Sequence, residues 1–239
     1  MSNNVPYDAH CHLGQNIINE DIYRAIAAIS ENDWSKLVTY RNSQVNVKIG
    51  FGIHPWHITD KDSADKLQEL LREKITLHKP NFIGETGLDA LKPNLELQIA
   101  FLKIHLKLAQ EFNLPIILHC VRAHNQLLQA LSDYPQVRGM IHAYNGNTDT
   151  AKQYHRKNMQ LGIGSTILNQ NSQLYKSIAN IPLEQLLIES DAPYMPQADK
   201  ATSSSDDCII YAKELAHLKQ KSLPEIISEV NQNWLNLFH

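Results

Sequence analysis

The sequence predicts an α/β fold, a TIM-type (β/α)8 barrel. Apolar segments of strand length alternate with amphipathic segments of helix length, and several apolar segments end in a histidine or a carboxylate. Strands that are apolar on both faces belong to parallel sheets covered by helices. About seven or eight such units in 239 residues fit a closed barrel better than an open sheet. We expect residues 1–239 to form a single barrel domain.

The expected elements follow from these two periodicities. Strands are expected at residues 5–7, 36–40, 45–53, 82–85, 115–119, 139–142, 159–164 and 186–191. Helices are expected at residues 20–29, 63–78, 94–112, 124–134, 150–157, 173–179, 209–219 and 224–238. The last helix has the pattern of a capping box at Ser222 and Glu225, with Pro224 in its first turn.

One connection conflicts with a regular barrel. The expected strands at residues 36–40 and 45–53 are too close for a crossover helix, because neighbouring parallel strands need about a dozen linking residues. Either residues 36–40 are not a barrel strand, or the barrel is distorted between its first and third strands.

The composition excludes several classes of protein. The net charge of −3 and the pI of about 6.4 give no general basic surface for nucleic acid, so a nucleic-acid substrate would be held locally or through metal. The first residues lack the pattern of a signal peptide, and no apolar run is long enough to span a bilayer. Cys11, Cys120 and Cys208 are odd in number and widely spaced, which argues against disulfides and favours a cytoplasmic protein.

The pair His10 and His12 lies directly after the first expected strand. Side chains two residues apart on a strand project to the same side, so these two imidazoles can bind one divalent cation. A lone His-x-His pair is also compatible with two polar residues near a strand end. Matching ligands from other strand ends decide between these interpretations.

Ligand-type residues do recur where other expected strands end. The full set is His10, His12, His54, Glu85, His119, His142 and Asp191. In a barrel the carboxyl ends of the strands share one rim, so these residues are expected to converge. Each also has a structural interpretation: a histidine can be a hydrogen-bonded core residue, Asp191 can form an Asx-turn, and Gly84 and Gly87 can be turn glycines. The other histidines are expected on the surface.

Imidazole and carboxylate ligands suit zinc, manganese or similar ions. Four histidines and two carboxylates are too many for one open catalytic zinc, which takes three protein ligands and water. Two ions that share a bridging carboxylate fit this number better, and such a pair polarises a substrate and lowers the pKa of water.

Six segments in order resemble the TatD-like metal-dependent hydrolases of the amidohydrolase superfamily: D-A-H-C-H-L, G-I-H-P, I-G-E-T-G-L-D, L-P-I-I-L-H-C, I-H-A-Y-N-G and E-S-D-A-P-Y-M. The resemblance extends from Pro6 to Met195 and implies a two-metal site of zinc, magnesium or manganese. It implies His10, His12 and Asp191 on one ion, His119 and His142 on the other, and Glu85 as the bridge. It also implies that Asp191 takes a proton from the attacking water and that His54 faces the substrate.

The sequence departs from the family at several positions. Many relatives have an arginine two residues after the histidine that matches His119, whereas here Arg122 comes one residue later. Tyr144 and Asn145 replace a phenylalanine and a serine, and the segment 196–207 lacks the arginine of a substrate-holding loop. These differences affect the substrate more than the metal site.

Three functions remain open from the sequence. The first is a hydrolase of phosphoester bonds, a deoxyribonuclease-type activity on DNA or on a small nucleotide-bearing molecule. The second keeps the metals but cleaves an aminoacyl ester, lactone or amide. The third is a barrel that binds metal without catalysis. We expect no membrane partner and a monomer or weak oligomer.

Overall fold

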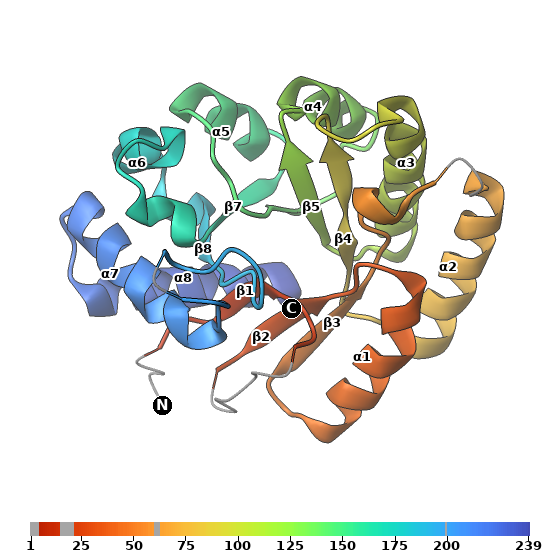
Figure 1. Ribbon diagram of the computed structural model, residues 1–239, viewed down its shortest axis with the longest axis horizontal. Helices are drawn as coiled ribbons and strands as arrows, with labels where there is room; N and C mark the ends of the chain where they lie inside the picture. The colour runs from red at the N-terminus through yellow and green to blue at the C-terminus, as the bar shows by residue number, and fades with distance from the viewer. Residues whose placement is uncertain (1–4, 15–21, 60–62, 199) are drawn as a thin grey trace.

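The computed structural model describes residues 5–14, 22–59, 63–198 and 200–239. Eight parallel strands form one sheet in sequence order and curve into a nearly closed barrel (Figure 1). They are β1 (Asp8–Cys11), β2 (Arg24–Ala27), β3 (Val47–Phe51), β4 (Phe82–Asp89), β5 (Ile116–Val121), β6 (Gly139–Ile141), β7 (Met159–Ile163) and β8 (Leu186–Ile188). Among the described residues, β1 and β8 form no ladder, which leaves one seam in the barrel. The predicted fold class is confirmed.

Helices surround the strands on the outside (Figure 1). They are α1 (Glu31–Ser43), α2 (Ala64–His78), α3 (Leu95–Phe112), α4 (His124–Ser132), α5 (Thr148–His155), α6 (Gln173–Ser177), α7 (Cys208–Lys219) and α8 (Leu223–Phe238). Short 3-10 helices connect them: η1 (Pro55–His57), η2 (Ser165–Leu168), η3 (Ile178–Asn180), η4 (Leu183–Gln185) and η5 (Ser205–Asp207). The predicted capping box of Ser222 and Glu225 starts α8. None of the described helices combines the length and the hydropathy that a membrane crossing requires.

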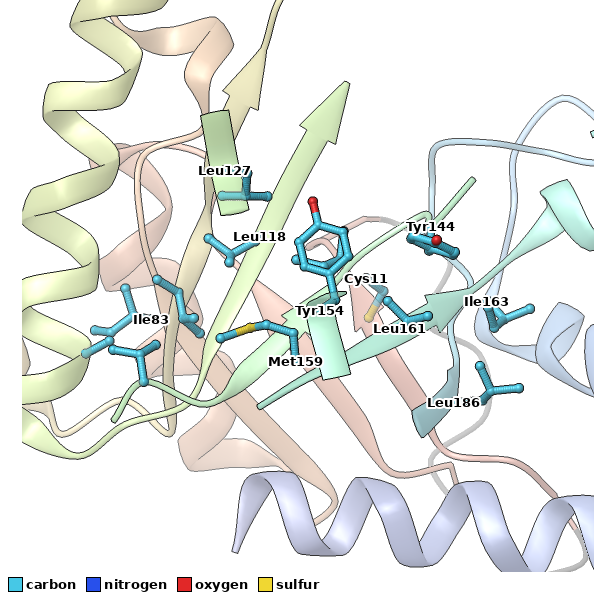
Figure 2. Packing of buried hydrophobic residues seen from close by; sticks show 14 of the residues in the cluster. Cys11, Ile83, Leu118, Leu127, Tyr144, Tyr154, Met159, Leu161, Ile163 and Leu186 are labelled. Atoms are coloured by element: carbon cyan, nitrogen blue, oxygen red, sulfur yellow. The ribbon is translucent and has the colours of Figure 1, made fainter. Parts of the chain in front are cut away.

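The core between the strands and the outer helices is apolar and well buried. Figure 2 shows Leu118 of β5 close to Leu127 of α4, and both side chains are fully buried. Tyr154 of α5 and Leu161 of β7 belong to the same buried cluster. This buried layer packs the strands against the outer helices.

A second apolar cluster closes one end of the barrel. Trp234 and Phe238 of α8 pack in this cluster with Phe82 at the start of β4, and the Trp234 and Phe82 side chains are fully buried. The Trp234 indole N–H donates to the carbonyl of Asp8, 3.3 Å away. Because α8 covers the end where the strands begin, only the carboxyl end of the barrel is left for a site.

Backbone hydrogen bonds beyond the strand β8 hold the seam together. The Asp191 N–H donates to the His10 carbonyl at 2.9 Å, and the His12 N–H donates to the Ala192 carbonyl at 2.7 Å. The segment after β8 therefore lies directly against the His-x-His segment.

The buried carboxylate of Asp8 reinforces this seam. It accepts hydrogen bonds from the hydroxyls of Ser190 at 2.6 Å and Ser205 at 2.7 Å, and from the Ser190 N–H at 2.9 Å. Burial raises the pKa of Asp8, and these hydrogen bonds oppose that rise. One side chain thus joins β1 to the two segments that follow β8.

Three predicted elements were wrong in the first quarter of the chain. The first strand is β1, not residues 5–7. A helix was predicted at residues 20–29, but this segment contains the strand β2. Residues 20 and 21 of that prediction lie outside the described residues. Residues 36–40 lie in the helix α1 and are not a strand. Since α1 is the crossover between β2 and β3, the conflict over the short connection disappears. The remaining expected strands and helices are present, with ends that differ by a few residues.

Candidate metal centre

All seven residues expected at the site lie together at the carboxyl end of the barrel. Each is at least nine-tenths buried, and each comes from a strand or from the residues just after one: His10, His12, His54, Glu85, His119, His142 and Asp191. Three groups among them bring their ligand atoms within 4.8 Å of one another: His10, His12 and Glu85; His10, His142 and Asp191; His54, Glu85 and His119. The barrel therefore gathers residues that are far apart in the sequence.

The Oε2 atom of Glu85 faces the first set of ligand atoms. It lies 3.4 Å from His10 Nε2 and 3.3 Å from His12 Nε2. Asp191 Oδ1 lies 3.4 Å from each of these two nitrogens. Four donors from three segments thus surround one point.

The Oε1 atom of Glu85 faces a second set. It lies 3.0 Å from His119 Nδ1, 3.2 Å from His142 Nε2 and 3.4 Å from His54 Nε2. The two oxygens of one carboxylate are therefore divided between two groups of imidazoles. This is the arrangement that a bridging carboxylate requires.

The separations in the first set have the size expected around a metal. Two donors of a tetrahedral ion with bonds of about 2.0–2.1 Å lie about 3.3–3.4 Å apart. The separations from Glu85 Oε2 to His10 and His12 match that value. Both ring nitrogens of His10 are also buried without a hydrogen-bond partner among the described residues. These observations fit a cation at this position better than a network of direct hydrogen bonds.

The charge balance of the site depends on its carboxylates. Burial alone would raise the pKa of Glu85, but the imidazoles of His142, His54 and His10 hold it well below its ordinary value. Burial likewise opposes ionisation of Asp191, and the imidazoles of His10 and His12, each 3.4 Å from Oδ1, lower its pKa instead. Both acids are therefore anionic and available as ligands.

Hydrogen bonds to the second ring nitrogen distinguish His12 from His54. His12 Nδ1 donates to the Ala27 carbonyl at 3.0 Å, which leaves the lone pair of Nε2 free for a metal. His54 Nδ1 accepts the Trp56 N–H at 3.2 Å, so neutral His54 carries its proton on Nε2. Burial lowers the pKa of His54, which favours this neutral form. His54 Nε2–H is thus a hydrogen-bond donor that faces Glu85 and the cavity.

Two glycines allow Glu85 to lie so close to β5. Gly87 has a φ of +147° and pairs with His119, and a Cβ atom there would lie 2.0 Å from the His119 carbonyl oxygen. Gly84 has a φ of +136°, also a conformation that side chains disfavour. The alternative that these are turn glycines is wrong, because both lie within β4.

A cavity of about 790 Å³ opens above the buried set. Its wall includes the half-exposed residues Trp56 and Tyr194, together with Met195 and Arg122. Arg122 has no carboxylate partner among the described residues, so it is available for an anionic group. The prediction that the remaining histidines are on the surface was wrong for His105, which is fully buried in α3. His57 is exposed and His124 is partly buried, and both line this cavity.

His105 supports the loop that carries His54. Its Nδ1 donates to the Phe101 carbonyl at 2.7 Å, and its Nε2 accepts the Ile53 N–H at 3.2 Å. Both bonds require a neutral ring, and burial lowers the pKa of His105 to about 4.

This buried histidine predicts a loss of stability in acid. Above about pH 6.5 both the folded and unfolded forms are neutral, and between about pH 6.5 and 4 only the unfolded form binds a proton. We expect about 3 kcal/mol of the free energy of unfolding to be lost as the pH falls through this window. Urea unfolding of metal-free protein at several pH values measures it. The variant His105→Gln should have a shallower pH dependence, and equal slopes would contradict this role.

This chain is similar to known proteins in both sequence and fold. The profile of a family described as TatD related DNase matches residues 7–239. The chain belongs to this TatD family. A relative from Haemophilus influenzae, named an uncharacterized metal-dependent hydrolase, is 28% identical over 216 residues, which cover 80% of this chain and 82% of the relative. A Pantoea vagans relative, named 3'-5' ssDNA/RNA exonuclease TatD, is 28% identical over 200 residues, which cover 78% of this chain and 76% of the relative.

The fold of this TatD family member is also found in a solved structure. The crystal structure of the TatD homologue YjjV from Escherichia coli superposes with a TM-score of 0.86 and 26% identity. The match covers 100% of this chain and 99% of the YjjV chain. This chain and the YjjV homologue therefore share one fold over their whole lengths.

Proposed function

We propose that this protein is a metal-dependent hydrolase that uses two divalent ions, with Glu85 as the ligand shared by both. One ion is held by His10, His12 and Asp191, and the other by His119 and His142. Family membership and the names of its relatives support the hydrolase class. The observation that carries the proposal is the division of the two Glu85 oxygens between two sets of imidazoles.

Two ions in such a site supply Lewis acidity, lower the pKa of water and stabilise both oxygens of a displacement. Asp191 is anionic and lines the cavity, so it accepts the proton of the attacking water. His54 Nε2–H donates a hydrogen bond to an oxygen of the substrate. Tyr194 and Trp56 line the opening and help to exclude water from the bound substrate.

The proposed substrate is a phosphoester, either a small molecule or a short nucleic-acid segment. The exonuclease name of the Pantoea relative supports this bond type. Arg122 is the single lysine or arginine among the described residues that line the cavity, and it suits one phosphate group. A long polyanion would need several such contacts.

A second candidate is the hydrolysis of an aminoacyl ester or amide at the same centre. The apolar and aromatic part of the wall, formed by Trp56, Tyr194, Met195 and Val121, favours a substrate with a substantial apolar group. The metals and Asp191 would act in the same way on a carbonyl centre.

The experiment combines metal analysis with a substrate panel. After mild loading with zinc, magnesium or manganese, elemental analysis should find close to two ions per chain. The loaded protein should hydrolyse bis-p-nitrophenyl phosphate faster than p-nitrophenyl carboxylic esters. The opposite ratio would favour the second candidate. A barrel that binds metal but hydrolyses none of these compounds with any of the three ions would contradict the assignment as an enzyme.

A further inference from the structure

His119 has one ring nitrogen whose partner is missing. Its Nδ1 faces Glu85 Oε1 at 3.0 Å and His142 Nε2 at 3.2 Å. Its Nε2 is buried and has no hydrogen-bond partner among the described residues. An imidazole that binds a metal through one nitrogen carries a proton on the other, and that proton needs an acceptor.

The carboxylate of Asp89 lies on that side of the ring. Asp89 Oδ2 is 4.0 Å from His119 Nε2, and the Asp89 side chain is only 3% exposed. A carboxylate oxygen can accept more than one hydrogen bond, so Oδ2 can accept a hydrogen bond from His119 Nε2–H as well as from Trp56. At 4.0 Å the two atoms are not hydrogen-bonded, and an approach of about 1 Å would bring them within hydrogen-bond distance.

Asp89 is held in place from several directions. Its Oδ2 accepts the indole N–H of Trp56 at 2.7 Å, and its Oδ1 accepts the Leu91 N–H at 2.9 Å. Gln98 of α3 fixes the main chain of Asp89 on both sides, with its Oε1 accepting the Asp89 N–H at 2.8 Å and its Nε2 donating to the Asp89 carbonyl at 3.2 Å. Such a fixed and buried anion is positioned to orient a neighbouring histidine.

We propose that Asp89 is a positioning residue for His119, and that Trp56 holds Asp89 in place. The Asp89 carboxylate accepts a hydrogen bond from His119 Nε2–H. This hydrogen bond orients the ring so that Nδ1 faces the ion that His142 and Glu85 also bind. This inference rests on the two-metal function proposed above. It adds a residue outside the ligand set, because Asp89 does not reach Glu85 or the other ligands.

The position of Trp56 connects this pair to the substrate cavity. The Trp56 side chain lines the cavity and is 59% exposed as a residue, yet its N–H points inward to Asp89. The outer face of its ring packs under Lys92 Nζ, 4.6 Å from the ring centroid. Trp56→Phe keeps an aromatic side chain at the cavity wall but removes the pyrrole part of the indole with its N–H, so it tests the support of Asp89 while an aromatic ring remains in the lining.

Three variants test the proposal: Asp89→Asn, Trp56→Phe and Asp133→Asn. Asp133 is a matched control, because it also loses one carboxylate charge but lies on the surface, paired with Lys103 at 3.2 Å. The first readout is stepwise zinc affinity, measured by competition with a chromophoric chelator. The second is the signal of the His119 Nε2 proton in NMR spectra of the zinc-loaded protein.

We expect Asp89→Asn to weaken one of the two zinc-binding steps by about tenfold to a hundredfold. The other step should be unchanged, and the His119 Nε2 proton should exchange with water faster. Trp56→Phe should weaken the same step by a smaller factor, and Asp133→Asn should match the wild-type protein. If Asp89→Asn does not fold, Trp56→Phe alone decides.

Two results would overturn the inference in different ways. If the wild-type protein binds two zinc ions and neither Asp89→Asn nor Trp56→Phe changes either step, the role of Asp89 is wrong and the two-metal centre stands. If the wild-type protein takes up fewer than two ions, the two-metal proposal fails and the role of Asp89 fails with it.

Discussion

Replacement of Glu85 by glutamine should reduce turnover by about three orders of magnitude or more. Glu85 offers one oxygen to each set of imidazoles, so the amide removes the negative charge that both proposed ions share. Lewis-acid stabilisation by metal is worth several kcal/mol, and each 1.4 kcal/mol changes a rate tenfold. The amide keeps the shape of the side chain, so packing in β4 should be preserved. Turnover, metal content and a thermal melt of the metal-free protein are measured on the same variant.

The control for this prediction is Glu73→Gln. Glu73 is exposed and pairs with Lys74, so its replacement changes the net charge by the same amount without touching the site. Its turnover and metal content should equal those of the wild-type protein. Near-normal turnover by Glu85→Gln on a substrate that the wild-type protein hydrolyses would mean that Glu85 has only a structural role in β4.

The later part of the barrel could be predicted from the sequence because β5, β6 and β8 are apolar runs that lead into polar residues. Residues 115–119 are an example, since β5 is buried on both faces up to His119 and the helix before it has clear amphipathic spacing. Strand ends in a barrel share a rim, so the convergence of Glu85, His119 and His142 followed from the fold class alone.

The prediction of the early part of the barrel was wrong where the local sequence pattern was ambiguous. Residues from Ile22 to Ile29 have apolar positions three and four apart, yet β2 is buried on both faces and even Arg24 is inside the protein. In α1, residues 36–40 contain β-branched and aromatic types that favour strands. The helix forms instead because Ser30 and Asp33 cap it and Trp34 and Leu37 bury one face. Tertiary packing outweighed local preference in both segments.

Details inside the site depend on tertiary contacts that the spacing of residues in the sequence does not reveal. The proton position on His54 follows from the Trp56 N–H, and the pairing of His119 with Asp89 joins two different strands. His105 was assigned to the surface because a helix position gives no sign of the loop that packs on it. Its contact with the Ile53 N–H exists only once α3 lies beside the segment that follows β3.

Asparagine at position 191 should also abolish most of the activity, by about two to four orders of magnitude. Asp191 Oδ1 lies between His10 and His12, and its backbone adopts a φ of +54°, a strained conformation for a residue with a side chain. Such strain is often found at functional positions, where the surrounding structure maintains it. The amide retains an oxygen ligand but cannot accept the proton of the attacking water, so at least one ion should remain bound.

The alternative is that Asp191 only shapes the turn into Pro193. In the structure the turn is closed by the Asp191 carbonyl, which accepts the Tyr194 N–H at 2.7 Å, while the Asp191 carboxylate faces the histidines. Asparagine would preserve that carbonyl, and it also tolerates positive φ better than most residues. A purely structural Asp191 would therefore leave Asp191→Asn almost fully active. Turnover and metal content measured together on this variant decide the matter, because a protein that keeps its ion but loses turnover has lost the proton acceptor alone.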